Sequence, residues 1–332
     1  MIIYSSFASG LETVVHDIIK NYAKIVKALN GAVIYDTTQL RDILTIPCFN
    51  NHFQVLFMKS GTMSPNNCVA ELLRNKNRIR FTVNDRTNTF RLMVSDQNSF
   101  VSADKQLKSE LEHLIAQKTG LMLDRAFADE EFWVLKRSEN LYMFMRRLNN
   151  HARQSYDKIL RKGELRPEIA YIMNYLSNPT PNDIYLDPFA GSGALGLSRY
   201  QHFGKCKRIY MFDNDESKVN QIRRTIGEQS SVYVSKTIDI RHIHTVIPAN
   251  GVTNIVTDPP WGLFDKKDNM EEFYIQMLAQ FKKALAPNAN VVVLTSRDAD
   301  FTNALRSFSV NACLQRHILV SGKKATITAF QM

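Results

Sequence analysis

The sequence has few cysteines, and their spacing fits neither a metal site nor a disulfide framework. The four cysteines, Cys48, Cys68, Cys206 and Cys313, are far apart and form no C-x-x-C pair. We therefore expect reduced thiols in the core of the protein and no bound metal.

Long hydrophobic runs are missing as well. Nowhere do about eighteen apolar residues follow one another, as a membrane-spanning helix requires. The first residues, Met-Ile-Ile-Tyr-Ser-Ser, lack the basic segment and the apolar stretch of a secretory leader. Low-complexity tracts and tandem repeats are also missing from the sequence. These features predict a folded protein in the cytoplasm with no membrane partner.

The sequence does carry an excess of positive charge. It has 42 Lys and Arg residues against 32 Asp and Glu residues, a formal net charge of +10. Its 332 residues can form two domains, each with its own core. A basic balance suits a partner made of phosphates, such as nucleic acid, although a basic protein without such a partner stays an open alternative.

An apolar strand followed by closely spaced glycines is the most informative stretch. Residues 183–193 read Asp-Ile-Tyr-Leu-Asp-Pro-Phe-Ala-Gly-Ser-Gly. Small residues such as Gly191 and Gly193, at the carboxyl end of a strand, let the main chain approach a ligand. The following helix offers free N–H groups at the same place. The stretch therefore predicts a nucleotide-binding turn.

A second stretch has the same organisation. Residues 254–262 read Asn-Ile-Val-Thr-Asp-Pro-Pro-Trp-Gly, an apolar strand followed by an acid, two prolines and an aromatic ring. Prolines stiffen a turn and fix the direction of its neighbours. Taken alone, this stretch could be a rigid strand exit with a buried tryptophan. Together with the glycine turn, it indicates a catalytic loop.

The second half of the chain alternates between strand and helix patterns. We expect strands at 183–187, 208–212, 231–235, 254–257 and 289–295, and helices at 192–202, 216–227, 270–285 and 298–307. This alternation predicts an α/β fold with a parallel sheet and right-handed crossovers. The last two strands, 312–320 and 325–331, are joined by a turn too short for a crossover, so they should be antiparallel.

The first half reads as a compact α+β region. We expect strands at 2–6, 32–36, 53–58, 79–83, 89–95, 131–136 and 141–147, and helices at 10–29, 38–44, 69–75 and 103–119. The last two of these strands should form a hairpin.

The two motifs together resemble those of the S-adenosylmethionine-dependent methyltransferases that modify exocyclic amino groups of bases. Residues 187–193 are similar to the cofactor motif of that family, and residues 258–261 are similar to its catalytic (Asp/Asn)-Pro-Pro-aromatic motif. The resemblance covers about half of the chain, residues 166–332. It implies a Rossmann-like class I methyltransferase sheet with an antiparallel terminal strand, and S-adenosyl-L-methionine as the cofactor.

The front half resembles THUMP-domain RNA methyltransferases in its element order and in short stretches such as Lys118-Thr119-Gly120-Leu121. This resemblance implies an N-terminal ferredoxin-like module at 1–60, a THUMP-like RNA-binding module at 61–148, a basic linker at 149–165 and the methyltransferase domain at 166–332. The expected partner is RNA, either tRNA or rRNA, bound by the basic N-terminal half and the linker. An unrelated α+β substrate domain stays open as an alternative.

Residues after the first strand would hold the cofactor. Asp187 ends that strand, where a carboxylate can face the methionine ammonium. Phe189 and Ala190 lie between it and Gly191 and Gly193, whose small size lets the main chain come close to the cofactor.

Four further residues complete the cofactor assignment. Asp213, followed by Asn214, ends the next strand and is placed to accept both ribose hydroxyls, or else to cap a helix. By resemblance, Asp239 would accept from the adenine amino group, and Arg166 would lie in the segment, beginning at Leu165, that packs over the methionine end. Asp239 could instead be a solvated loop acid, and this segment an ordinary helix start.

The catalytic motif suits a poor nucleophile. The lone pair of an exocyclic base amine is delocalised, so Asp258 and the Pro259 carbonyl would accept its two hydrogens and turn the lone pair toward the methyl carbon. Pro259 and Pro260 stiffen the loop, and Trp261 can stack on the base. The base must be single-stranded or flipped out to arrive there. A covalent pyrimidine C5 mechanism is disfavoured, because no cysteine lies near this loop.

The sequence leaves alternatives open for the substrate and for the enzyme class. The THUMP-like front half favours guanine N2 in tRNA or rRNA, whereas adenine N6 in RNA or DNA fits the catalytic motif equally well. An NAD-dependent dehydrogenase is a rival, because residues 191–196 also fit G-x-G-x-x-G and Asp213 follows about twenty residues later. A further rival is an RNA-binding protein with an inactive catalytic domain, against which the complete set of acids argues.

Overall fold

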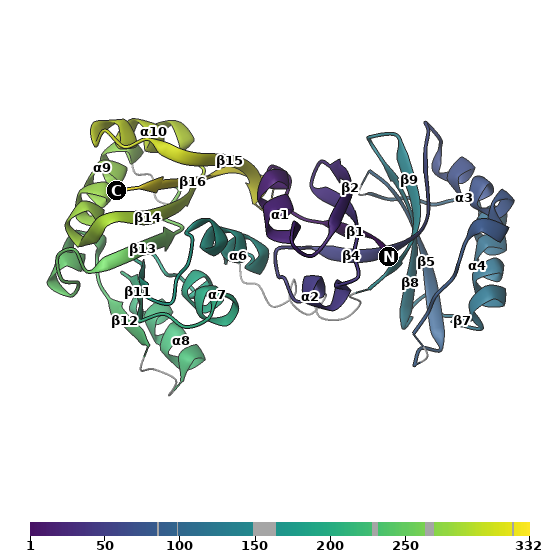
Figure 1. Ribbon diagram of the computed structural model, residues 1–332, viewed down its shortest axis with the longest axis horizontal. Coiled ribbons are helices and arrows are strands. Elements are labelled where there is room, and N and C mark those ends of the chain that lie inside the picture. Colours follow the sequence, from purple (N-terminus) through teal and green to yellow (C-terminus); the bar gives the residue numbers. More distant parts are fainter. Residues whose placement is uncertain (85, 98, 149–163, 228–231, 263–268, 321) are drawn as a thin grey trace. The chain divides into compact units, whose positions relative to one another are not determined.

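The computed structural model describes residues 1–84, 86–97, 99–148, 164–227, 232–262, 269–320 and 322–332 (Figure 1). The chain forms two compact units. Unit 1 comprises Met1–Phe7 and Val15–Ile159, and unit 2 comprises Ala8–Val14 and Leu160–Met332. None of the described helices is long and apolar enough to cross a membrane.

Unit 1 is built on a nine-stranded sheet. Eight of its strands follow the order β2-β3-β1-β4-β9-β8-β5-β6, and the ninth, β7, pairs with β5. The strands are β1 (Ile2–Ser6), β2 (Lys24–Leu29), β3 (Ala32–Asp36), β4 (Asn51–Ser60), β5 (Thr89–Asp96), β6 (Ser99–Phe100), β7 (Met122–Leu123), β8 (Glu130–Arg137) and β9 (Leu141–Arg147). Strands β8 and β9 form the predicted antiparallel hairpin, and β5 runs parallel to β8.

Helix α1 (Glu12–Ile19) has its first three residues in the segment assigned to unit 2 and the others in unit 1. The other helices of unit 1 are α2 (Leu40–Leu44), α3 (Pro65–Arg74) and α4 (Lys105–Thr119), with a short 3-10 helix η1 (Lys76–Arg78). Helix α3 begins after Ser64, whose side chain accepts the N–H of Asn67, and α4 begins after Asp104. Helices α3 and α4 pack their apolar faces against β5, β8 and β9 in one core cluster. Gly120, in a left-handed conformation with φ 75°, ends α4.

Two of the element predictions in unit 1 are wrong. The helix expected at 10–29 ends at Ile19, and strand β2 follows. Residues Lys24–Leu29 alternate between exposed and less exposed positions, which is the pattern of a strand with one face more covered than the other, and β2 pairs with β3. The strand expected at 79–83 is irregular chain, in which Ile79 nevertheless packs into the core.

The predicted boundary at residue 60 falls inside a shared sheet. Strand β4 pairs with β9, so the predicted ferredoxin-like and THUMP-like modules contribute to the same sheet. The division into four segments stays a prediction. The basic linker expected at 149–165 lies outside the described residues except for 164 and 165.

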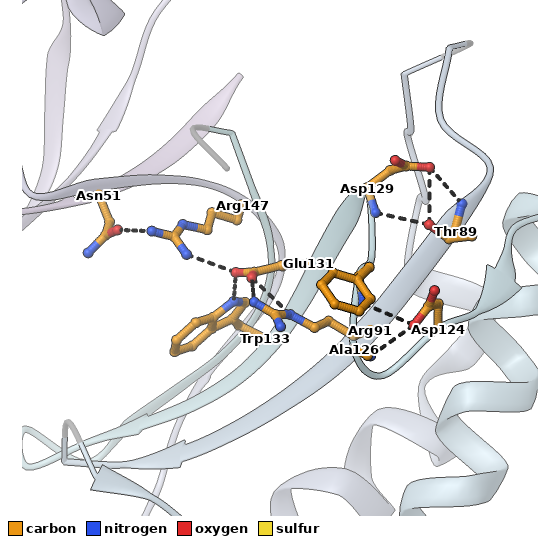
Figure 2. A network of polar contacts seen from close by, with 10 residues as sticks. Asn51, Thr89, Arg91, Asp124, Ala126, Asp129, Glu131, Trp133 and Arg147 are labelled. Carbon is orange, nitrogen blue, oxygen red and sulfur yellow. Dashed lines mark hydrogen bonds and ion pairs between the residues drawn. The ribbon is translucent and has the colours of Figure 1, made fainter. Parts of the chain in front are cut away.

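Buried carboxylates connect the strands of this sheet (Figure 2). Glu131 on β8 is 3% exposed and accepts hydrogen bonds from Arg91 of β5, from Arg147 of β9 at 2.9 Å and from the Trp133 indole at 3.0 Å. Burial works to raise the pKa of Glu131, but the bonds from Arg91 and Arg147 outweigh it and lower the pKa. The carboxylate therefore stays ionised and joins three strands.

Unit 2 holds a seven-stranded sheet with the order β12-β11-β10-β13-β14-β16-β15. Its strands are β10 (Ile184–Asp187), β11 (Arg208–Asp213), β12 (Tyr233–Thr237), β13 (Val252–Thr257), β14 (Leu285–Thr295), β15 (Ala312–Val320) and β16 (Lys323–Gln331). The neighbouring strands among the five from β10 to β14 all pair in parallel, and β16 inserts between β14 and β15 antiparallel to both. The expected reversed final strand is confirmed.

The helices of unit 2 are α6 (Pro167–Leu176), α7 (Ala194–Phe203), α8 (Glu216–Ile226), α9 (Met270–Ala284) and α10 (Asp298–Ser307), with a 3-10 helix η2 (Ile240–Thr245). Helices α9 and α10 pack on the face of the sheet that carries Leu186, in one apolar cluster with the strand residues of that face. The neighbouring Tyr185 is also buried and points to the opposite face, because successive strand side chains alternate. Both faces of the sheet are therefore covered. A ligand site can form at the ends of its strands.

A buried arginine binds the residues that precede β10, the first strand of unit 2. The fully buried Arg199 of α7 donates to the carboxylate of Asp183 at 3.0 Å and to the carbonyl of Thr180 at 2.7 Å. Arg199→Leu leaves a buried carboxylate without its cation, so we expect the free energy of unfolding to fall by about 3–5 kcal/mol in chemical denaturation. Arg224→Leu, at an exposed position of α8, is the matched control. Equal stability of the two variants would contradict the assignment.

Candidate active site

The two sequence motifs meet at one edge of the sheet. Strands β10 and β13 are parallel neighbours, so their carboxyl ends, Asp187 and Thr257, lie side by side. The Thr257 hydroxyl donates to Asp187 Oδ1 at 2.8 Å, and Asp258 is the next residue. The structure therefore brings the glycine turn and the Asp-Pro-Pro-Trp loop together. Sequence reasoning missed Thr257, although its place before Asp258 at a strand end was a usable signal.

Among the described residues, Asp187 has hydrogen-bond donors for only one of its two carboxyl oxygens. It is 1% exposed, and its Oδ1 accepts from Thr257 and from the Phe189 N–H at 3.2 Å. Its Oδ2 is buried and has no hydrogen-bond partner among the described residues. Burial, reinforced by the nearby Asp258 and Asp213, raises the pKa of Asp187 to about 8 against the pull of its two hydrogen bonds. A cationic donor at Oδ2 would satisfy this carboxylate.

The glycine turn uses backbone conformations that favour glycine. Gly191 has φ 54° and Gly193 has φ 83°, both left-handed. The Gly193 N–H donates to the Ala190 carbonyl at 2.7 Å, and a Cβ on Gly193 would lie 3.1 Å from Ile222. Gly193 also precedes the first residue of α7, so the turn leads directly into a helix N-terminus suited to polar ligand groups.

Asp213 organises this turn from the end of β11. It is 6% exposed and accepts the N–H of Gly191 at 2.9 Å and the N–H of Asp215 at 3.0 Å. The cap of helix α8 is Asp215, so capping is not the role of Asp213. Asn214, next to it, is exposed. Asp213 therefore lies with Gly191 at the same sheet edge as Asp187.

Asp239 and Arg166 are engaged with other charged residues. Asp239 follows β12, caps η2 and accepts hydrogen bonds from Nε and Nη2 of Arg241, each at 2.9 Å. This pairing lowers the pKa of Asp239 to about 2. Arg166 precedes the first residue of α6 and donates from Nε to Glu168 at 2.8 Å, after the buried Leu165. Arg241 was not predicted from the sequence.

The Asp-Pro-Pro-Trp loop has an internal hydrogen bond. The indole Nε1 of Trp261 donates to Asp258 Oδ1 at 2.8 Å. Asp258 and Trp261 are partly buried, Pro259 is buried and Pro260 is exposed. Burial raises the pKa of Asp258 to about 7, and the bond from Trp261 opposes that shift. Sequence reasoning expected Trp261 to stack on a base and missed this contact.

Comparisons with known proteins identify the second half. The UPF0020 family model, described as an RMKL-like methyltransferase domain, matches residues 154–325, just over half of the 332-residue chain. A tRNA (guanine(6)-N2)-methyltransferase from Thermus thermophilus is 26% identical over 171 residues, which are 51% of this chain and 50% of the relative. The mouse tRNA (guanine(6)-N(2))-methyltransferase THUMP3 is 30% identical over 155 residues, which are 42% of this chain and 30% of the relative.

The fold has a match along the whole chain. The crystal structure of TrmN from Thermus thermophilus superposes with a TM-score of 0.82 at 20% identity, covering 99% of both chains. At this identity the match shows a shared fold. By sequence, the matched segment spans at most about half the length of the curated relatives.

The dehydrogenase alternative finds no support. The glycine turn that fits the dinucleotide fingerprint lies beside an Asp-Pro-Pro-Trp loop in a sheet whose last strand is reversed, and the matching family is one of methyltransferases. This chain belongs to the UPF0020 family of RMKL-like methyltransferase domains.

Proposed function

We propose that this protein is an S-adenosylmethionine-dependent methyltransferase that modifies the exocyclic N2 of guanine in tRNA. The observation that carries the proposal is the junction of the two motifs, where Thr257 donates to Asp187 at 2.8 Å and Asp258 follows. The names of the matched relatives support the guanine and tRNA assignments. A cytoplasmic location agrees with that substrate.

The residues at the glycine turn fit the cofactor. The Oδ2 of Asp187, which has no hydrogen-bond partner in the described part of the chain, suits the methionine ammonium, because a buried carboxylate gains most from a cationic donor. Gly191 and Gly193 keep the main chain open for close approach. Asp213, with Asn214, would take the ribose hydroxyls. When bound, S-adenosylmethionine supplies an electrophilic methyl group whose leaving group is a neutral thioether.

Asp239 and Arg166 complete the proposed cofactor set. Asp239 would accept from the adenine amino group, with its carboxylate kept ionised and oriented by Arg241. Arg166 would cover the methionine end from the start of α6 together with Leu165. Phe189 and Ala190 would line the cofactor between Asp187 and Gly191.

The catalytic loop would orient the base and take its proton. Asp258 and the Pro259 carbonyl accept the two amine hydrogens, so the nitrogen lone pair points at the methyl carbon. As the new C–N bond forms, the nitrogen loses one proton to Asp258, whose pKa of about 7 suits a proton acceptor near neutral pH. Pro260 keeps the loop rigid, and Trp261 offers its ring face to the base.

The RNA would be held by the basic N-terminal half and the linker, since phosphates attract the chain's excess of cations. The experiment that tests the substrate is mass spectrometry of nucleosides from tRNA and rRNA treated with the protein and S-adenosylmethionine. We expect N2-methylguanosine from tRNA. N6-methyladenosine, or modification of rRNA alone, would contradict the proposal, and no methylation by the wild-type protein would favour an inactive RNA-binding protein.

Cofactor binding should release a proton. Asp187 has a pKa of about 8 without ligand, so at pH 7 it is mostly protonated, and pairing with an ammonium requires its ionised form. We expect calorimetry of S-adenosylhomocysteine binding at pH 7, in buffers of different ionisation enthalpy, to report release of about one proton. The Asp258→Asn variant should still release a proton, because Asp187 is intact there and burial, the largest cause of its raised pKa, is unchanged. A binding enthalpy independent of the buffer would contradict this assignment.

A further inference from the structure

The indole N–H of Trp261 has a function separate from that of its ring face. We infer that Trp261 is a positioning residue for Asp258, holding one carboxylate oxygen so that the other is presented to the substrate amine. This inference rests on the proposed function and assigns to Trp261 a task that stacking does not include. The Nε1–Oδ1 distance of 2.8 Å is that of a strong charge-assisted hydrogen bond.

The chain around Trp261 fixes where the indole lies. Pro259 and Pro260 restrict the backbone on one side. On the other side, Gly262 adopts φ 68°, and a Cβ there would lie 3.2 Å from Met270 Cγ at the start of α9. Both flanks of the tryptophan are thus restrained, so the N–H is aimed by the loop itself and does not depend on a bound base.

The groups facing Asp258 come from several elements. Asp187 of β10 is a second acid, and it lies close enough to Asp258 for the charge of Asp258 to raise the pKa of Asp187. Tyr274 of α9 is close enough to Asp258 for the charge of Asp258 to raise the pKa of the Tyr274 hydroxyl. Asp300 of α10 and Arg297, which precedes α10, also act on this hydroxyl by their charges. The same hydroxyl shares a hydrogen bond of 2.7 Å with Thr295. Among the described residues, Trp261 provides the hydrogen bond that favours the ionised form of Asp258.

Two consequences for the chemistry follow from this contact. With Oδ1 held by Trp261, the carboxylate cannot rotate freely, so Oδ2 has a fixed direction in which to accept an amine hydrogen and later the proton. A donor to the ionised form also keeps the acid available at lower pH. A phenylalanine at this position could stack on a base equally well but could not supply either effect.

The variant Trp261→Phe separates the two tasks, because it keeps an aromatic face and removes the N–H. With saturating S-adenosylmethionine, so that Asp187 is paired, kcat of the wild type should rise with pH through a midpoint near 7. For Trp261→Phe we expect the midpoint to move up by about one pH unit and kcat at pH 6.5 to fall about tenfold. The KM for tRNA should change by less than about threefold.

The control is Trp261→Leu, which removes both the N–H and the ring face and should raise the KM for tRNA as well. In an Asp258→Asn background, Trp261→Phe should cause no further shift of the pH profile, because no carboxylate remains to titrate. A Trp261→Phe enzyme with an unchanged pH profile, or with a loss confined to KM, would overturn the inference and leave stacking as the function of the residue.

A second readout needs no activity and so separates failure of this inference from failure of the proposed function. The chain has 2 tryptophans, and in a Trp133→Phe background Trp261 is the sole indole fluorophore. Its emission should change with pH around 7, as protonation of Asp258 weakens the hydrogen bond. The change should vanish in Asp258→Asn. Fluorescence emission that does not change with pH would refute the contact, whatever reaction the enzyme catalyses. The same change with pH in the proteins with and without Asp258→Asn would refute it as well.

Discussion

Asp258→Ala is expected to slow methyl transfer by about 10²–10⁴-fold, the range over which a positioned proton acceptor contributes to a reaction rate. The side chain removed is the acceptor proposed to orient the amine and to take its proton at the end of β13. Asp258→Asn should fall between wild type and Ala, because an amide oxygen can still accept a hydrogen bond but cannot take up a proton. Incorporation of labelled methyl groups into tRNA under single-turnover conditions measures these rates.

The control for both variants is cofactor binding. Asp258 directly follows β13, and it is not among the residues assigned above to the cofactor. The affinity for S-adenosylhomocysteine should therefore stay within about threefold of wild type by calorimetry. Wild-type rates of methyl incorporation by Asp258→Ala would remove the proposed role of the loop.

Asp187→Asn should have the second large effect, a loss of cofactor affinity of about 100-fold or more. The buried Oδ2, to which none of the described residues donates, is proposed to bind the ammonium of the cofactor. An asparagine can keep the bond from Thr257 through its oxygen, but its NH₂ group would face the ammonium with donors against donors. Calorimetry with S-adenosylhomocysteine measures the loss, and micromolar binding retained by the variant would contradict it.

The same substitution should stabilise the protein without ligand at alkaline pH. The folded pKa of Asp187, about 8, lies above its ordinary value of 3.8, so the native state retains a proton that the unfolded chain releases. Stability contributed by this group is therefore lost as pH rises from about 4 to about 8. Asparagine has no such loss, so its melting temperature should exceed that of wild type at pH 8 by about 2–6 °C, and by less at pH 5.

The matched control for this gain is Asp215→Asn. Asp215 caps α8, and hydrogen bonds from Ser217 lower its pKa, so neutralising it should not stabilise the protein at pH 8. A melting temperature for Asp187→Asn at or below that of wild type at pH 8 would show that burial of this carboxylate does not strain the ligand-free protein.

The sequence was sufficient to predict the sheet of unit 2 and the meeting of its motifs, for a physical reason. Parallel strands place their carboxyl ends at one edge, so an acid ending 183–187 and an acid following 254–257 had to lie near each other. The reversed final strand followed from a turn too short for a crossover. In unit 1, the apolar residues of 24–29 fitted a helical spacing as well as a strand, and pairing with β3 decided between them.

Side-chain partners within the site could not be predicted in the same way. Spacing places Asp239 at a loop but does not reveal that Arg241 clamps it, because the direction of a side chain depends on local backbone angles. The bond between Trp261 and Asp258 likewise depends on the turn made by the two prolines. These contacts and the burial of each side chain decide which acids are ionised without ligand. Neither the contacts nor the burial can be derived from the sequence.

The most direct test of the central claim is a crystal structure with S-adenosylhomocysteine bound. We expect the amino nitrogen of the ligand at about 3 Å from Asp187 Oδ2. The sulfur of the ligand should face Asp258 at the same edge of the sheet. A ligand bound elsewhere, or an Asp258 side chain turned away from the sulfur, would contradict the account.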